Sequence, residues 1–179
     1  MERLKETLSA AGIAYKENEP LCAHCTFRIG GPADLFVLPE NEEQLCAAIR
    51  LAKEAGVRSY LLGNGSNILF EDAGYRGAVI NVSAMKSGIG VIENISFPGK
   101  DPALTYDAVV VGAGQMLSSL CMAALENSLT GLEFAYGIPG TVGGAVYMNA
   151  GAYGGEMKDV LASVRYLTGE GEIVEAPAE

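Results

Sequence analysis

The chain has few of the residues from which common active sites are built. It contains no tryptophan and one histidine among 179 residues, and 12 basic residues stand against 22 acidic ones. The single histidine, His24, lies in the segment Cys22-Ala-His24-Cys25, and no Gly-x-Ser-x-Gly motif occurs, so no hydrolytic triad can be assembled. A net charge of -10 without a basic block argues against general nucleic-acid binding.

Cysteine is also scarce, with four residues in the whole chain. The Cys22-x-x-Cys25 spacing occurs in redox pairs and in half of a zinc site. No second such pair and no histidine pair follows it. We therefore expect free thiols and no metal site.

An apolar signal sequence is missing, because the start, MERLKETLSAAG, is charged and amphipathic. This favours a cytoplasmic location. Residues 134–155 carry no charge, but they include seven glycines and a proline and little leucine, isoleucine or valine. Such a composition argues against a transmembrane helix, and no membrane partner is expected.

Glycine is abundant and unevenly distributed. Of 23 glycines, 19 follow residue 60, and eight lie between Gly131 and Gly155. No Gly-X-Y period is present, which excludes collagen. Glycines crowded into one apolar stretch indicate tight turns or backbone that lies close to a ligand.

Hydrophobic periodicity predicts an α+β fold with two lobes, the first spanning residues 1–83. Its expected elements are a helix at 2–11 ended by Gly12, a strand at 33–38, a helix capped by Asn41 and ended by Gly56, and strands at 57–62 and 77–82. Strand, helix and strand joined by short links predict a βαβ unit with parallel strands.

The second lobe, residues 84–179, has a different pattern. Strands are expected at 90–97 and 105–111 with no helix between them, which favours antiparallel pairing. A helix is expected at 115–127, and a closing hairpin is expected around Gly169 and Gly171.

The first candidate binding segment follows the strand that ends at Leu62. It reads Gly63-Asn64-Gly65-Ser66-Asn67 and continues into the apolar residues from Ile68. Two glycines permit positive φ, and successive N–H groups in such a turn can form an anion-binding nest. The alternative is an ordinary hairpin turn around Asn-Gly.

The second candidate is the stretch from residue 133 to residue 155. No lysine or arginine lies between Gly112 and Gly155, so phosphate binding here would use backbone amides, for example at a helix that begins near Thr141. The pair Gly143-Gly144 would remove side chains from the surface that faces the ligand. The alternative is tight packing of a helix on a sheet.

A third segment resembles a dinucleotide fingerprint but departs from it. Gly112-x-Gly114 follows a strand and precedes a helix, yet Leu117 replaces the third glycine. Because the preceding strand is expected in an antiparallel sheet, this argues against a Rossmann site for a nicotinamide cofactor.

Three segments together resemble one family, the UDP-N-acetylenolpyruvoylglucosamine reductases of peptidoglycan synthesis. They read HCTFRIGGPADLFVLP, LLGNGSNILFEDAGYRG and ALENSLTGLEFAYGIPGTVGGAVYMNAGAYGGEMKDV. The FAD domain of this family is shared with the vanillyl-alcohol-oxidase-like flavoproteins. The resemblance implies that FAD binds between the two lobes. It assigns the cofactor-binding role to Leu62, Gly63, Asn64, Gly65, Ser66, Asn67, Ile68, Gly137, Ile138, Pro139, Gly140, Gly143, Gly144, Asn149, Gly151 and Ala152.

The resemblance also implies an activity. In the family, NADPH reduces FAD, and the reduced flavin passes a hydride to the enolpyruvyl group of a UDP-sugar. The catalytic arginine, serine and glutamate are expected beyond Glu179, so neither Arg28 nor Arg165 is assigned that role, and this chain alone is expected to be catalytically incomplete. The alternatives are another FAD-dependent oxidase or dehydrogenase of the same fold, or a non-catalytic flavin-binding fragment.

Overall fold

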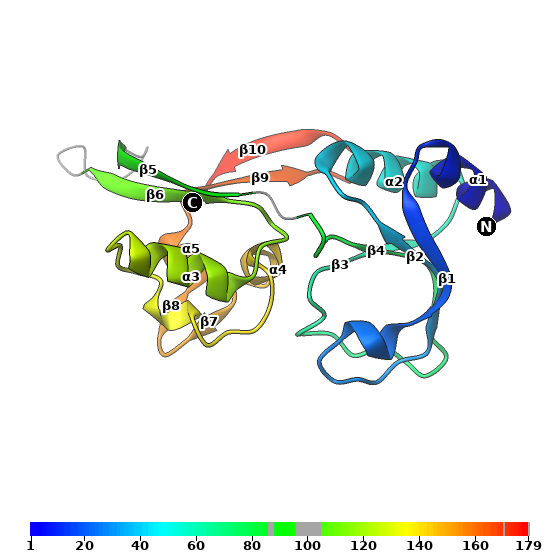
Figure 1. The fold of residues 1–179 in the computed structure, drawn as a ribbon, viewed down its shortest axis with the longest axis horizontal. Coiled ribbons are helices and arrows are strands. Elements are labelled where there is room, and N and C mark those ends of the chain that lie inside the picture. The colour runs from blue at the N-terminus through cyan, green and yellow to red at the C-terminus, as the bar shows by residue number, and fades with distance from the viewer. Residues whose placement is uncertain (86–87, 96–104, 170, 179) are drawn as a thin grey trace. The chain divides into compact units, whose positions relative to one another are not determined.

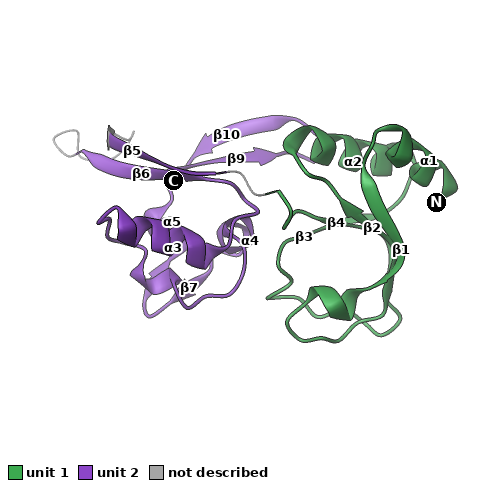
Figure 2. Cartoon of the chain, viewed as in Figure 1, with its two compact units in different colours: residues 1–85 green, residues 86–179 purple. Residues whose placement is uncertain are grey.

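The chain divides into two compact units, residues 1–85 and 86–179 (Figure 2). The computed structural model describes residues 1–85, 88–95, 105–169 and 171–178. Helices and strands alternate in the first unit, whereas short hairpins and helices make up the second (Figure 1). This mixed content confirms the α+β prediction.

The first unit is built on one four-stranded sheet. Its elements are α1 (Glu2–Ala10), β1 (Ala14–Pro20), the 3-10 turn η1 (Leu21–His24), β2 (Pro32–Leu38), α2 (Glu42–Glu54), β3 (Ser59–Leu62) and β4 (Tyr75–Asn81). The strand order is β1-β2-β4-β3, and β4 runs parallel to both β2 and β3. The prediction of parallel strands is therefore confirmed.

Strand β1 was not predicted, because its sequence AYKENEP reads as a polar link. It pairs antiparallel with β2 at the edge of the sheet. Most of its residues are exposed, as is tolerated on an edge strand that has only one neighbour.

Capping residues in the local sequence determine where α2 begins and where α1 and α2 end. The Asn41 side chain accepts a hydrogen bond of 2.9 Å from the amide of Gln44 and caps α2. Gly12 and Gly56 follow α1 and α2 with φ of +67° and +66°. The residue after each glycine donates to the carbonyl five residues earlier at 2.9 Å, which is the Schellman arrangement.

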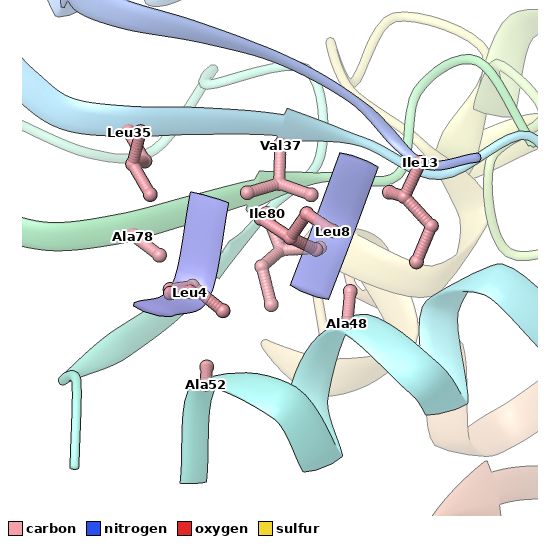
Figure 3. Packing of buried hydrophobic residues seen from close by; sticks show 9 residues of the cluster. All are labelled: Leu4, Leu8, Ile13, Leu35, Val37, Ala48, Ala52, Ala78 and Ile80. Carbon is pink, nitrogen blue, oxygen red and sulfur yellow. The ribbon is translucent and has the colours of Figure 1, made fainter. Parts of the chain in front are cut away.

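Alternation along the strands gives the sheet two buried faces. Leu35 and Val37 of β2 point to the face covered by α1 and α2, whereas Phe36 points to the opposite face. Figure 3 shows the cluster under the helices, termed here the helix-side cluster, which consists of Leu4, Leu8, Ile13, Leu35, Val37, Ala48, Ala52, Ala78 and Ile80.

Loops cover the opposite face of this sheet. Their loop-side cluster consists of Leu21, Cys25, Ala33, Phe36, Leu62, Phe70 and Val79. Because Leu21 and Cys25 come from one loop and Phe70 from another, this packing fixes both loops against the sheet. These loops are the segments from which the first candidate site is built.

The described residues of the second unit form three separate two-stranded sheets and a small helical core. Its elements are β5 (Ile89–Ile95), β6 (Tyr106–Val111), α3 (Leu117–Glu126), the 3-10 turn η2 (Glu133–Ala135), α4 (Val142–Tyr147), β7 (Gly151–Ala152), β8 (Gly155–Glu156), α5 (Met157–Val160), β9 (Ser163–Leu167) and β10 (Ile173–Pro177). The pairs β5–β6 and β9–β10 are antiparallel, as predicted. Residues 96 and 97 of the first predicted strand lie outside the described residues.

The short β7–β8 hairpin was not predicted, because two-residue strands leave no periodic signal. A core of Leu117, Leu120, Cys121, Ala135, Val142, Ala145 and Met157 joins α3, η2, α4 and α5. In the part of the chain that the structure describes, no helix is both long and apolar enough to cross a membrane.

Replacing Leu8 tests the role of α1 in the first unit. Leu8 is fully buried in the helix-side cluster, so Leu8→Ala is expected to lower the free energy of unfolding by about 2–5 kcal/mol in a urea titration. The matched control is Leu125→Ala on α3, because Leu125 is 68% exposed and should cost less than about 0.5 kcal/mol. Equal losses for the two variants would show that α1 does not pack as described.

Candidate functional site

The turn at residues 63–67 lies at the carboxyl edge of the parallel strands in the first unit. Because β3 and β4 are parallel neighbours, the residues that follow them meet at the same edge of the sheet. A surface pocket of about 440 Å³ opens there. It is lined by Ala23, His24, Cys25, Thr26, Arg28, Gly63, Asn64, Asn81 and Ser83.

Gly65 is buried and lies against the backbone of the segment at 24–26. Its φ is +64°, and an added Cβ would collide with the His24 carbonyl oxygen and lie 2.8 Å from Cys25 Cα. The Thr26 amide donates to the Gly65 carbonyl oxygen at 3.0 Å, and the Thr26 hydroxyl donates to the Ser66 carbonyl oxygen at 3.4 Å. The two loops are therefore joined by direct backbone contact, which only glycine permits at this position.

Three amides of this turn lack an acceptor in the part of the chain that the structure describes. Among the described residues, the N–H groups of Asn64, Gly65 and Asn67 donate no hydrogen bond. Backbone donors are nearly always satisfied, by protein, water or a ligand. Several free donors in one glycine-containing turn can bind an anion.

Asn81 fixes the start of the turn from the neighbouring strand. It is 5% exposed, and its side-chain amide donates to the Gly63 carbonyl oxygen at 3.0 Å. Its side-chain oxygen accepts from the amide of Ser83 at 3.2 Å and from the Ser83 hydroxyl. Both ends of the Asn81 side chain therefore hold backbone at the rim of the pocket.

The cysteine pair beside the pocket consists of free thiols. Cys22 is half-buried and Cys25 is buried in the loop-side cluster. His24 stacks on Phe36 with ring centroids 4.1 Å apart, and its Nε2 lies 2.8 Å from a Glu19 carboxylate oxygen. His24 is thus part of the packing of this loop, and no group of metal ligands occurs among the described residues.

The second candidate segment uses its helix amides differently. Thr141 caps α4 and accepts a hydrogen bond of 3.3 Å from the amide of Gly144. The amide of Val142 donates to the Gln115 carbonyl oxygen at 2.8 Å, and that of Gly143 donates to the Ala113 carbonyl oxygen at 2.9 Å. The first amides of α4 are therefore engaged by acceptors within the second unit, unlike those of the turn at residues 63–67.

At Gly143, the contact agrees with the packing alternative. An added Cβ at Gly143 would lie 2.7 Å from Ala113 Cβ, so this glycine permits close packing within the second unit. Gly137 differs, because nothing lies within 4 Å of an added Cβ there. Of these two glycines, Gly137 is the one that faces open space.

Of the remaining predicted residues in this segment, some are packed within the second unit and others are exposed. Ile138 packs against the core of the second unit, and Pro139 is exposed. Gly140 is buried with φ of +132°, and its carbonyl oxygen accepts from the Leu117 amide at 3.0 Å. Gly140 therefore anchors the start of α3, and Pro139 and Gly137 form the accessible part of the turn.

A second pocket, of about 410 Å³, brings together Asn149, Gly151 and Ala152 with Glu156. The Asn149 side chain donates to the Glu156 carboxylate at 2.8 Å and accepts from the Lys158 amide at 3.0 Å. Two hydrogen bonds hold the pKa of the Glu156 carboxyl below its ordinary value. The larger effect comes from the Lys158 side chain and the smaller from the Asn149 side chain. The Asn149 side chain therefore closes the β7–β8 hairpin, in which Asn149 itself has φ of +45°.

The fingerprint-like Gly112-x-Gly114 segment is not a Rossmann turn. The strand before it, β6, pairs antiparallel with β5. The carbonyl oxygen of Ala113 accepts the Gly143 amide, so this turn packs on α4.

Sequence reasoning missed several residues of the first pocket, namely Thr26, Arg28, Asn81 and Ser83. The predicted parallel strands at 57–62 and 77–82 could have indicated some of these residues. Residues that follow two adjacent parallel strands lie at the same edge of the sheet. That signal points to residues 81–83 but not to Thr26 or Arg28, which reach the pocket through the loop at 24–31.

Two glycine-to-alanine substitutions test these backbone contacts. Gly65→Ala should lower the free energy of unfolding by at least about 1–2 kcal/mol, because alanine is strained at positive φ and its Cβ meets His24. Gly137→Ala should change it by less than about 0.5 kcal/mol, because its Cβ enters open space. Thermal and urea unfolding give both values, and a neutral Gly65→Ala would contradict the close approach of the two loops.

Comparison with known proteins agrees with this architecture. The chain is 42% identical over 174 residues to a UDP-N-acetylenolpyruvoylglucosamine reductase from Lachnoclostridium phytofermentans, covering 97% of this chain and 53% of the relative. It is 46% identical over 165 residues to the reductase of the same name from Clostridioides difficile, covering 92% and 50%. The chain thus spans about half the length of the curated relatives it matches.

Solved structures show the same fold. A UDP-N-acetylenolpyruvylglucosamine reductase from Thermus caldophilus matches with a TM-score of 0.65 at 29% identity, over 93% of this chain and 52% of that one. A VAO-type flavoprotein from Myceliophthora thermophila matches with a TM-score of 0.65 at 19% identity, over 81% of this chain and 26% of that one. The protein family described as FAD binding domain matches residues 33–177. The chain therefore belongs to the FAD-binding domain family.

Proposed function

We propose that this chain binds FAD and holds the cofactor's diphosphate on the turn at residues 63–67. The observation that carries the proposal is the set of free amides at Asn64, Gly65 and Asn67. A diphosphate offers several acceptor oxygens with negative charge, and hydrogen bonds to charged groups are stronger than those to neutral ones. The family match to an FAD-binding domain supports the identity of the ligand.

The residues around this turn fit such a group. The pocket has no aspartate or glutamate among the described residues that line it, although the chain carries 22 acidic residues. Asn64 and Ser83 add neutral polar side chains at its rim. Leu62, just before the turn, belongs to the loop-side cluster, and Ile68, just after it, packs against that cluster. The turn is therefore held rigidly before a ligand arrives, which lowers the cost of binding.

In the second unit, we assign cofactor contact to the exposed turn at Gly137 and Pro139 and to the pocket formed by Asn149, Gly151 and Ala152. Open space at Gly137 and the pocket itself support this assignment. Ile138, Gly140, Gly143 and Gly144 would act indirectly, through packing and hydrogen bonds within the second unit.

At the level of the whole protein, we propose that the chain is the FAD-binding portion of a cytoplasmic reductase of peptidoglycan synthesis. Relatives at 42% and 46% identity that carry this name support the proposal. Bound FAD would accept a hydride from NADPH and pass it to the enolpyruvyl group of UDP-N-acetylglucosamine enolpyruvate. No catalytic residue is assigned within this chain, whose role is to bind and orient the cofactor.

Flavin titration tests the binding proposal. The 179-residue chain should quench flavin fluorescence on binding FAD and should bind riboflavin, which lacks the diphosphate, at least about tenfold more weakly. Gly137→Leu should weaken FAD binding by about tenfold or more without changing the melting temperature. Gly90→Leu is the matched control, because an added Cβ there also meets nothing within 4 Å. A wild-type chain that retains no FAD would contradict the proposal.

A steady-state assay tests the proposed NADPH-dependent reduction of the enolpyruvyl substrate. A complete reductase that includes this chain should oxidise one NADPH for each UDP-N-acetylmuramate formed from the enolpyruvyl substrate. The 179-residue chain loaded with FAD should form no product. Consumption of oxygen with another substrate, without NADPH-dependent product, would instead favour a different flavin oxidase of this fold.

A further inference from the structure

We infer that Arg28 is a diphosphate-binding residue, which pairs its guanidinium group with the phosphate that lies on the turn at residues 63–67. This inference rests on the proposed function and adds a cationic side chain to the backbone amides proposed there. Its basis is the position, conformation and surroundings of Arg28.

The position of Arg28 is fixed relative to the free amides. Arg28 lines the same pocket as Gly63 and Asn64. Two residues earlier, Thr26 donates both its amide and its hydroxyl to carbonyl oxygens of the 63–67 turn. The amide of Arg28 closes a turn by donating to the Cys25 carbonyl oxygen at 3.2 Å. The loop that carries Arg28 is therefore hydrogen-bonded directly to the turn that carries the free amides.

The backbone of Arg28 is in a conformation that arginine rarely adopts. Its φ is +55°, in the left-handed region that favours glycine. A glycine at position 28 would adopt this conformation without strain. Local strain retained at one residue of a pocket is consistent with a functional side chain.

The guanidinium group has no recorded partner in the described ranges of the chain. Among the described residues, no ion pair or side-chain hydrogen bond involves Arg28, whereas Arg76 pairs with Asp34 at 2.7 Å and Lys158 with Glu156 at 2.6 Å. Arg28 is also the sole lysine or arginine among the described residues lining the pocket, which no carboxylate lines. A cationic side chain and free amides at one pocket form a site for a phosphate group.

Arg28→Gln is the direct test, with Arg50→Gln as the matched control. Both changes remove one positive charge from the first unit, but Arg50 lies on α2 and pairs with Glu54. Arg28→Gln should raise the dissociation constant for FAD and for ADP by about tenfold to a hundredfold. Riboflavin binding should stay unchanged, and the dependence of FAD affinity on salt should become weaker. Arg50→Gln should change none of these quantities.

Two further variants separate charge from folding. Arg28→Lys should retain part of the affinity, because lysine keeps the charge but not the planar fork of donors. Arg28→Gly relieves the positive φ, so its melting temperature should not fall, yet it should lose as much FAD affinity as Arg28→Gln. An Arg28→Gly chain that binds FAD like the wild type would overturn the inference even if Arg28→Gln folded poorly.

The remaining outcomes distinguish this inference from the proposed function. Wild-type binding of FAD with no loss in Arg28→Gln overturns the inference alone. Arg28-dependent binding of ADP without any binding of FAD would support the diphosphate site and contradict the FAD proposal. A loss confined to UDP, with FAD and ADP unaffected, would place a substrate diphosphate at Arg28 and overturn its role in holding the cofactor.

Discussion

The candidate site depends on one close approach, that of the Gly65 backbone to the segment at His24–Thr26. The 3.0 Å hydrogen bond from the Thr26 amide to the Gly65 carbonyl oxygen joins two loops that are 39 residues apart in sequence. Because a side chain at Gly65 would collide with this segment, the approach requires glycine. It positions the free amides of the turn and the Arg28 side chain at one pocket.

The two glycine-rich segments use their amides in opposite ways. The turn at 63–67 leaves three amides without an acceptor in the described residues, whereas α4 engages the amides of Val142, Gly143 and Gly144 within the second unit. Glycine content alone does not distinguish these cases. The difference follows from neighbours distant in sequence, because Ala113 and Gln115 supply two of the acceptors for α4.

Features set by local sequence could be predicted, and features set by distant contacts could not. Asn41, Gly12 and Gly56 mark helix ends correctly, because capping involves residues within one turn of the helix. Strand β1 was missed because its residues are mostly polar and its only partner is β2. Arg28 could not be placed at the pocket, since its loop reaches the site through Thr26 and the sheet edge. The cofactor-binding residues themselves remain a proposal.

Amide chemical shifts during an ADP titration test whether the diphosphate binds to the turn at residues 63–67, because they report on each backbone donor separately. In ¹⁵N-labelled protein, we expect the largest changes at the amides of Asn64, Gly65 and Asn67, saturating together with those of the Arg28 loop. The amides of Val142, Gly143 and Gly144 should remain bonded to their internal acceptors and shift little. Saturable changes at these three α4 amides, with none in the 63–67 turn, would contradict the account.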